Sequence, residues 1–531
     1  MRRALPIGFA LVGSALFLWP GRLGLLGDPA GETHNHLWFF ARSLLGLEAN
    51  YPAGWEVPLM DPPNLPWFAL GWLVSPTVAW NFVAVANVLL GCFGGWVLGK
   101  QVSGTAAGAF VGLAAVGWSP FLSGAIDFGV TEAYPLGFYA LHVAMMERLR
   151  GAPKARGVAI VAGVTLACFA LSGWYHAAFA LVVSPLLAGR VRSPAVFLVG
   201  AIALLLVLPR FLQLLPHLGV WADRAAGLSD PTDIRAWQRQ ERYGIDALRF
   251  LPSLTTFTPS VSVYLGVALV GLSLLGGRAS LPWLGMALPL YLLALGHWLR
   301  LGGHVVRLEE PLLMPAGWLV KFSQSARFIT HWYRAAGPAS VLLAAAAAVG
   351  AGRLARRLEH HRITPVLGPL LASLALADSL AFSSTRWPRV AAPLPAAPPL
   401  SIDGPVLDLP LDDNRTRPEV YGSRRPYWMW QLAHRQPVSE NYEAADSVLR
   451  ESGEARDIQA ACGGLPEARP GASSSDEIAV GSDAVSLRSL GFRWIVVHTA
   501  VAPAGCAEAV GGRFGAPSLT VNGARAWQIE L

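Results

Sequence analysis

Long apolar runs separated by short polar connections dominate the first 382 residues. A helix needs about 20 mainly apolar residues to cross the hydrocarbon core of a bilayer. A run at 65–75 is too short to cross and is expected at the membrane surface, where its Trp67 and Trp72 suit the headgroup level. The longer runs predict eleven transmembrane helices, near 4–26, 77–99, 104–122, 132–149, 157–173, 175–189, 193–209, 260–277, 281–299, 336–352 and 364–382.

Two details of this pattern stay open. The segment 157–189 can also be one continuous helix, and the run at 104–122 ends at a Ser-Pro pair. The first run, 4–26, resembles a signal peptide in length and position. It lacks a small-x-small cleavage site, so we interpret it as a membrane anchor.

Basic residues in the short connections predict the orientation, since Lys and Arg are enriched in cytoplasmic loops. With eleven spans, every basic connection falls on one side. The N-terminus is then cytoplasmic, and the long loops 27–76, 210–259 and 300–335 lie outside. The basic residues concerned are Arg2, Arg3, Lys100, Arg148, Arg150, Lys154, Arg156, Arg190, Arg192, Arg278, Arg353, Arg356, Arg357 and Arg362.

The pattern changes after residue 382. A proline-rich linker leads into residues 383–531, which have the pattern of a small exoplasmic α/β domain, separate from a transmembrane domain at 1–382. Strands are expected at 405–410 and 492–498, and a helix at 441–461. Cys462 and Cys506 both fall in this segment and are expected to pair if it faces an oxidising compartment.

Composition limits the classes of protein to which this chain can belong. Hydrophobic residues make up 53% of the chain and charged residues 14%, whereas soluble domains carry roughly 25% charged residues. This excludes a soluble multidomain enzyme and a disordered chain. The net charge of +7 is spread between the apolar runs, so it does not indicate a nucleic-acid partner; the expected partner is the lipid bilayer.

The first outer loop carries the most informative chemistry. Asp28 and Glu32 follow the first run directly, and carboxylates near a membrane surface often have functional roles. Apolar residues then recur at helical spacing from Thr33 to Leu45, which predicts an interfacial helix. A simpler interpretation is that Glu32 is a first-turn residue favoured by the helix dipole.

Glu32, His34 and His36 are also the residue types that ligate metals. On a helix, however, residues two apart point in different directions, which disfavours a zinc site. Mg²⁺ or Mn²⁺ on Glu32, with substrate phosphate supplying further ligands, is chemically more plausible. His34 and His36 remain candidate substrate contacts.

Four further residues are predicted on the same outer side: Glu132, His176, Arg327 and His331. Ionisable residues at membrane depth are costly and often functional, and arginine binds phosphate bidentately. Arg334 lies with Arg327 and His331 just before the tenth predicted helix. The simpler alternatives are that Arg327 and Arg334 snorkel to the surface and that His176 is a hydrogen-bonded turn residue.

The order of these features resembles the polytopic glycosyltransferases of the C-type superfamily (GT-C). The resemblance rests on the acidic loop and helix from Gly27 to Leu47, the segment Tyr51 to Asn64, the Ser119-Pro120-Phe121 end of the third run, and the two strands of the C-terminal segment. It implies a bacterial inner-membrane enzyme with its catalytic acid in the first outer loop. Glu32 or Asp28 matches that position, although an aspartate pair is the usual pattern.

The resemblance implies that a sugar moves from a polyprenyl-phosphate donor to an exoplasmic glycan, lipid or protein acceptor, with inversion at the anomeric carbon. The alternative is a non-catalytic membrane protein, either a transporter or an assembly factor for envelope polymers. A transporter is expected to show internal repeats and polar groups at the membrane midplane. The sequence has no convincing repeat, which favours the transferase.

Overall fold

A computed structural model describes most of the transmembrane region and part of the C-terminal segment. The chain divides into two compact units, one of residues 1–28 with 58–392 and one of residues 29–57 with 393–531. The described residues are 4–20, 23–28, 31–47, 61–228, 245–252, 263–323, 326, 329, 331–383, 387–394, 401–409, 430–438, 458, 462, 486–499, 502, 505–521 and 523–529.

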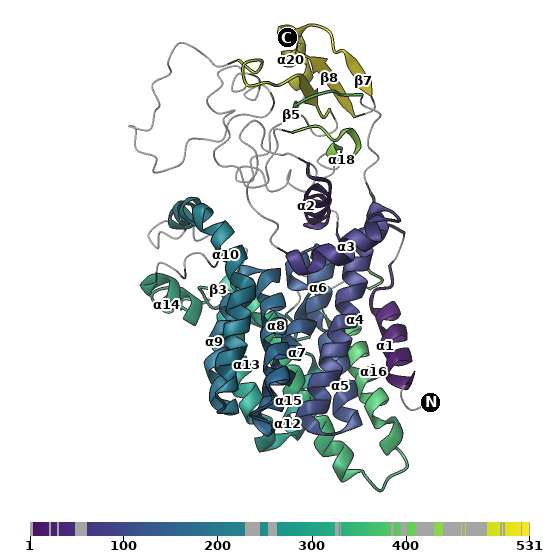
Figure 1. Ribbon diagram of the computed structural model, residues 1–531, viewed down its shortest axis with the longest axis vertical. Helices are drawn as coiled ribbons and strands as arrows, with labels where there is room; N and C mark the ends of the chain where they lie inside the picture. Colours follow the sequence, from purple (N-terminus) through teal and green to yellow (C-terminus); the bar gives the residue numbers. More distant parts are fainter. Residues whose placement is uncertain are drawn as a thin grey trace. The chain divides into compact units, whose positions relative to one another are not determined.

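The first unit is a bundle of helices (Figure 1). Its α-helices are α1 (Ala4–Phe17), α3 (Leu65–Trp72), α4 (Pro76–Ser103), α5 (Ala106–Gly117), α6 (Pro120–Phe128), α7 (Leu136–Gly151), α8 (Arg156–Ser172), α9 (Trp174–Val191), α10 (Ala195–Leu228), α12 (Val267–Leu275), α13 (Leu281–Ala294), α14 (Pro315–Phe322), α15 (Ala336–Arg357) and α16 (Thr364–Phe382). Short 3-10 helices and strand pairs complete it: η1 (Pro62–Asn64), η2 (Thr131–Ala133), η4 (Ala247–Phe250), η5 (Gly277–Ala279), η7 (Trp332–Ala335), β1 (Leu25–Leu26) with β4 (Ala391–Ala392), and β2 (Arg300–Leu301) with β3 (His304–Val305).

Every predicted run contains helix, and five helical segments among the described residues are long and apolar enough to cross a membrane. The chain is therefore a multi-pass helical membrane protein. Crossing by the remaining runs stays a prediction. The five segments are Pro76–Ser103, Ala106–Phe128, Ala195–Leu215, Trp332–Arg357 and Thr364–Phe382.

Burial separates inner helices from outer ones. The apolar window within Trp332–Arg357 is 94% buried inside the protein, whereas that within Ala195–Leu215 is only 6% buried. Helix α10, which contains Ala195–Leu215, therefore exposes large apolar side chains, including Phe197 and Leu205. A helix that is apolar all round but uncovered by protein is suited to contact with lipid.

The first helix is shorter than the sequence predicts, and the run at 104–122 is divided between α5 and α6 at Trp118 and Ser119. The first helix ends at Phe17, not near residue 26, because the residue before Pro20 is biased toward extended backbone; the chain then forms β1, which pairs with β4. The segment 157–189 is two helices, as the list of eleven runs has it and not the single helix of the alternative, since Gly173 between α8 and α9 is extended, with φ −176°.

Close backbone approach joins α4 to α5. A Cβ added to Gly95 would collide with the carbonyl oxygen of Gly112, and one added to Gly99 would collide with that of Gly108. Glycines spaced four apart lie on one helix face, which lets two membrane helices pack backbone to backbone.

The second unit contains a four-stranded sheet in the order β5-β6-β8-β7. β5 and β6 are parallel, and the other two pairs are antiparallel. The predicted strands at 405–410 and 492–498 correspond to β5 and β6, whereas the expected helix at 441–461 lies almost wholly outside the described residues. The elements are α2 (Thr33–Leu45), β5 (Val406–Leu409), α18 (Gln431–His434), β6 (Trp494–Val497), α20 (Cys506–Phe514), β7 (Leu519–Val521) and β8 (Ala524–Gln528).

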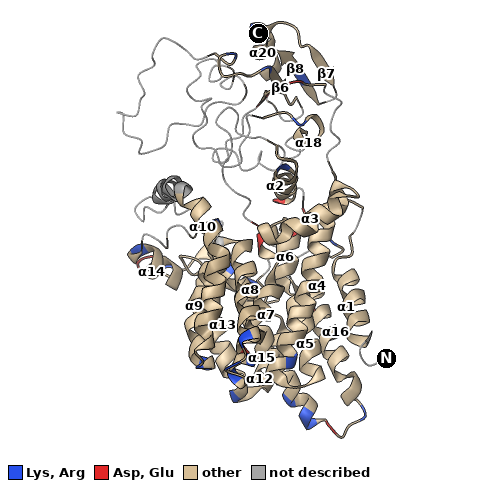
Figure 2. Cartoon of the chain, viewed as in Figure 1, with Lys and Arg blue, Asp and Glu red and all other residues tan. Residues whose placement is uncertain are grey.

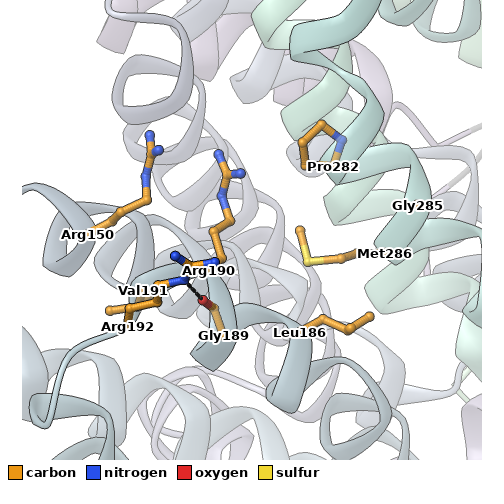
Figure 3. Close-up of a pocket in the computed structure, with 9 residues that line it drawn as sticks. All are labelled: Arg150, Leu186, Gly189, Arg190, Val191, Arg192, Pro282, Gly285 and Met286. Carbon is orange, nitrogen blue, oxygen red and sulfur yellow. Dashed lines mark hydrogen bonds between the residues drawn. The ribbon is translucent and has the colours of Figure 1, made fainter.

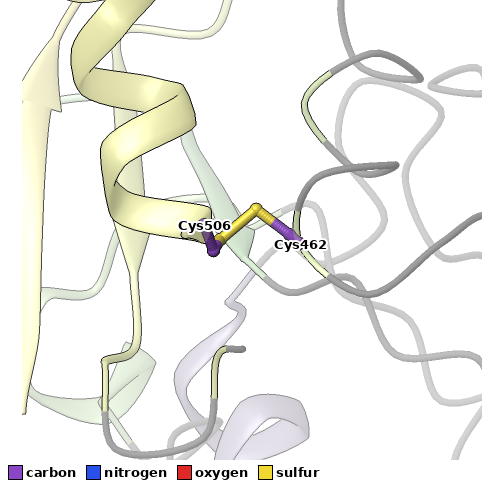
Figure 4. The surroundings of a disulfide bond; sticks show 2 residues. All are labelled: Cys462 and Cys506. Atoms are coloured by element: carbon purple, nitrogen blue, oxygen red, sulfur yellow. A yellow bond between two sulfur atoms is a disulfide. The ribbon is translucent and has the colours of Figure 1, made fainter. Parts of the chain in front are cut away.

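A disulfide joins Cys462 to Cys506 at the start of α20 (Figure 4). Both cysteines lie in the buried core of this unit, with Leu407, Ile495 and Trp527. Disulfides persist in oxidising compartments, which favours the predicted exoplasmic location of the C-terminal segment.

Residues 29–57 of the first outer loop belong to this second unit. Its helix α2 forms where the apolar spacing predicts it. The indole Nε1 of Trp38 donates to Oε1 of Gln431 at 2.8 Å, and Nε2 of His34 lies 3.0 Å from the carbonyl oxygen of Pro393. Two polar contacts, one of them buried, thus tie α2 to the segment that follows residue 392.

Candidate functional site

The two ends of the helical bundle differ in charge. Figure 2 shows that Lys and Arg gather at the end where α7, α9 and α15 finish, which we call the basic end. The opposite end, where these helices start, is called the ion-pair end. Each helix has a charged or histidine residue at its start and an arginine in its last turn. Glu132 of η2 precedes α7, which holds Arg150; α9 holds His176 and Arg190; Arg334 of η7 precedes α15, which ends at Arg357.

A salt bridge lies at the centre of the ion-pair end. Nη1 of Arg334 is 2.6 Å from Oε1 of Glu132, and the side chains are 7% and 15% exposed. The guanidinium also lies 4.9 Å from the ring centre of Tyr175. Removing one member of a buried pair typically costs about 3–5 kcal/mol, because the other charge is left uncompensated. Replacing either Glu132 or Arg334 alone is therefore expected to destabilise the folded protein.

His331 joins this group through Tyr175. Its Nδ1 lies 3.2 Å from the Tyr175 hydroxyl, with the two ring centres 5.3 Å apart. Burial, and after it the nearby Arg334 charge, lowers the pKa of His331 to about 3. The imidazole is consequently neutral at physiological pH, so it acts as a hydrogen-bonding group and not as a cation.

His176 is the least satisfied polar side chain of the group. It is 1% exposed and packs against Phe169, with ring centres 5.1 Å apart. Neither ring nitrogen has a hydrogen-bond partner in the described part of the chain. An added Cβ on Gly173 would lie 3.1 Å from His176 Nδ1 and 3.4 Å from Glu132 Cβ, so the two side chains flank one glycine. A buried imidazole without partners is an expected contact point for a ligand or water.

A second buried network lies at the same end. Nδ2 of Asn64 donates to Oδ2 of Asp61 at 2.8 Å, and Nδ2 of Asn87 donates to Oδ1 of Asn64 at 2.6 Å. Burial raises the pKa of Asp61 to about 8, and the Glu132 charge adds to this rise. Asp61 is therefore mainly protonated at neutral pH.

Asp28 and Asp127 lie near a second buried arginine. The backbone N–H of Asp28 donates to the carbonyl oxygen of Asp127 at 2.6 Å. Nη1 of Arg389 is 3.3 Å from the Asp127 carboxylate, and its Nε donates to the carbonyl oxygen of Phe17 at 2.8 Å. This arginine connects the ends of α1 and α6, a structural role.

Glu32 occupies the N-cap position of α2 without capping the helix through its side chain. Its Oε2 accepts a hydrogen bond from Nδ2 of Asn35 at 2.6 Å. His34 is buried, whereas His36 is partly exposed and its ring lies 6.2 Å from that of Phe39. Among the described residues, no group of three or more His, Cys, Asp or Glu side chains is arranged to hold a metal ion.

The structure therefore brings together Glu132, His176 and His331, three of the four residues predicted beyond the first outer loop. Arg327 lies outside the described residues. Glu32, His34 and His36 belong to the second unit, and Asp28 belongs to the first.

Asp61 is the site residue that sequence reasoning passed over, whereas Arg334 was noted beside Arg327 but not selected as a site residue. A signal for Arg334 was present, because an arginine on the predicted outer side departs from the enrichment of basic residues in cytoplasmic loops. Arg389 is a second such residue, and each of the two is paired with an acidic side chain. For Asp61, nothing in a Pro-rich loop indicates that its carboxyl group is buried.

The chain is similar to several solved membrane proteins. ArnT from Cupriavidus metallidurans, bound to undecaprenyl phosphate, is 14% identical, with 99% of this chain and 97% of that chain covered and a TM-score of 0.44. The apo state of ArnT gives 13% identity, the same coverage and a TM-score of 0.39. The oligosaccharyltransferase AglB from Archaeoglobus fulgidus, in complex with an inhibitory peptide and a dolichol-phosphate, is 11% identical, with 94% of this chain and 70% of that chain covered and a TM-score of 0.41. No family model and no curated protein matches the sequence.

Proposed function

We propose that this protein is a membrane glycosyltransferase that moves a sugar from a polyprenyl-phosphate donor to an acceptor hydroxyl. The observation that carries the proposal is the buried group of Glu132, Arg334, His331 and His176 at the ion-pair end of the bundle. Burying this many ionisable side chains in a bundle of apolar helices is costly, and such groups typically mark substrate sites.

Arg334 is the proposed phosphate ligand, in the role that the sequence assigned to Arg327. Glu132 pairs with Nη1 of its guanidinium, and Nε donates to the Tyr333 hydroxyl at 3.5 Å. A guanidinium has five N–H donors, so the pair with Glu132 leaves donors for an anion. The planar group can then stabilise the charge that develops on the leaving phosphate.

The neutral histidines suit the sugar. His176 has two unpartnered nitrogens in the described part of the chain, and a neutral imidazole offers one donor and one acceptor to hydroxyl groups. Hydrogen bonds of this kind orient the sugar without adding charge beside the anomeric carbon.

The reaction is a single displacement. The acceptor oxygen attacks the anomeric carbon, the bond from that carbon to the phosphate oxygen breaks, and the carrier leaves as polyprenyl phosphate. A carboxylate takes the proton from the acceptor hydroxyl. Sequence reasoning alone proposes Glu32 for this role, with Asp28 as the alternative. Attack opposite the leaving group inverts the anomeric carbon.

The experiment is sugar transfer by the purified full-length protein from a polyprenyl-phosphate donor. Arg334→Lys keeps the charge opposite Glu132 but loses the planar fork, so we expect transfer to fall by about 10²-fold or more. Glu32→Gln is expected to abolish transfer while the protein still folds, as judged by an unchanged Tm.

Glu359→Gln is the matched control, because Glu359 is exposed beyond the last turn of α15 at the basic end. It is expected to transfer at the wild-type rate. Wild-type transfer by Arg334→Lys would contradict the proposed phosphate ligand. Wild-type transfer by Glu32→Gln would eliminate the proposed base, and Asp28→Asn would then be tested.

A further inference from the structure

A hollow of about 700 Å³ opens at the basic end of the bundle. The last turns of α7 and α9 and the first turns of α13 line it (Figure 3). Its volume lies within the roughly 300–1,000 Å³ of typical small-molecule sites. The lining combines three arginines with apolar groups: Arg150, Arg190 and Arg192, with Leu186, Pro282 and Met286 among the others.

Two of the arginines are positioned by one acidic residue. Glu147 binds Arg190 through Nε at 3.0 Å and Arg150 through Nη2 at 2.5 Å. Arg190 also lies 4.9 Å from the ring centre of Trp283. The guanidinium groups of Arg150 and Arg190 point the same way in Figure 3. Two arginines paired with one carboxylate leave one net positive charge at this position.

Arg192 adds a second charge. It ends α9 in the left-handed conformation, with φ 51°, which costs a residue other than glycine about 1 kcal/mol. Its Nε donates to the carbonyl oxygen of Gly189 at 3.2 Å. No acidic side chain pairs with it in the described part of the chain. Among the described residues, Arg192 is therefore a cation of the pocket without an acidic partner.

The neighbouring loop increases this positive charge. Oγ of Ser193 donates to the carbonyl oxygen of Pro153 at 2.8 Å, which holds the loop between α7 and α8 against the end of α9. Lys154 follows Pro153 directly. The pocket and its rim thus form a site for an anion.

Exposed apolar side chains continue from the pocket along both helices. Leu186 is 50% exposed on α9, and Leu281 and Leu288 are 59% and 57% exposed on α13. In a membrane protein, apolar surface of this kind contacts lipid chains. A free phosphate would use only the arginines, whereas a phospholipid would also cover these leucines.

We propose that this pocket binds the phosphate of an anionic glycerophospholipid headgroup, with its acyl chains along α9 and α13. Basic pockets between transmembrane helices are suited to such headgroups. The site is separate from the ion-pair end, and the proposal does not depend on the glycosyltransferase function.

The test compares three probes on the detergent-purified full-length protein: dioctanoyl phosphatidylglycerol, dioctanoyl phosphatidylcholine and inorganic phosphate. The apparent Kd of each comes from the rise in Tm during titration. We expect phosphatidylglycerol to bind most tightly and Arg192→Gln to weaken it about tenfold, the usual loss for one charge-assisted hydrogen bond. Arg190→Gln is a second variant. It can fail to fold because Glu147 loses a partner, and in that case the effect of Arg192→Gln on phosphatidylglycerol binding tests the proposal.

Arg357→Gln is the matched control, an exposed arginine in the last turn of α15 at the same end but outside the pocket. It is expected to bind phosphatidylglycerol like the wild type. The proposal is overturned if Arg192→Gln binds like the wild type or if Arg357→Gln weakens binding equally. An equal Tm rise with inorganic phosphate at the same concentration would identify a free-anion site and reject the lipid.

Discussion

Asp61 shows how burial changes the chemistry of a single side chain. It is 3% exposed, and its Oδ2 accepts from Asn64. Because the folded protein raises its pKa to about 8, the carboxyl group keeps its proton through most of the physiological range. Below about pH 4 both the folded and the unfolded chain bind this proton, and above about pH 8 neither does.

This gives a prediction for stability. Between about pH 4 and pH 8 only the folded chain holds the Asp61 proton, so the free energy of unfolding falls by about 1.4 kcal/mol per pH unit. Asp61→Asn removes this dependence. We expect the Tm of the wild type to fall relative to that of Asp61→Asn as pH rises from about 5 to about 8 in detergent solution.

The exposed Glu359→Gln variant serves as the control and is expected to follow the wild type across this range. A constant difference in Tm between wild type and Asp61→Asn over the same pH range would refute the raised pKa.

At the residue scale, charge pattern and membrane position together selected the candidate residues. Glu132, His176 and His331 were selected because ionisable groups are rare in apolar runs, and the structure places all three at the ion-pair end. The partner of Glu132 required the structure. Arg334 lies far from it in the sequence, and no local pattern identifies which arginine reaches which acid.

At the scale of helices, the glycines between α4 and α5 set how closely the backbones approach. Gly95 and Gly99 face the carbonyl oxygens of Gly112 and Gly108. A methyl group at Gly95 would push the two helices apart, and α5 in turn packs on α15 and α16.

We therefore predict that Gly95→Ala lowers stability by about 1–3 kcal/mol, the usual cost of overpacking. The matched control is Gly157→Ala in α8, where an added Cβ meets nothing within 4 Å. Since alanine is a better helix former, by up to about 1 kcal/mol, the control is expected to be neutral or stabilising. A Tm for Gly95→Ala equal to or above that of the wild type would show that the close approach of α4 and α5 does not require glycine at this position.

Helix positions were largely predictable because apolar runs of membrane length leave few alternatives. The residues at which helices end were less predictable. Trp19-Pro20 ends the first helix early, and the 14 residues of α1 are fewer than the run predicts. The division at Gly173 was one of two open interpretations, because a glycine inside an apolar run can continue a helix or break it.

At the scale of the whole molecule, the helical unit has two ends that suit different ligands. The ion-pair end holds Glu132, Arg334 and the two histidines, whereas the basic end holds the arginine pocket. The sequence predicted this polarity through its basic connections. It did not predict that residues 29–57 belong with the C-terminal segment, because that association depends on interactions between distant parts of the chain, such as Trp38 with Gln431.

The most direct measurement is to map where the carrier binds. A polyprenyl phosphate with a photoreactive group beside its phosphate is crosslinked to the purified protein, and the labelled peptides are identified by mass spectrometry. We predict label in residues 131–136, 174–179 or 331–336, removed by excess unlabelled carrier and reduced by Arg334→Lys. Label only in the connections of the basic end, or label unaffected by competition, would contradict it.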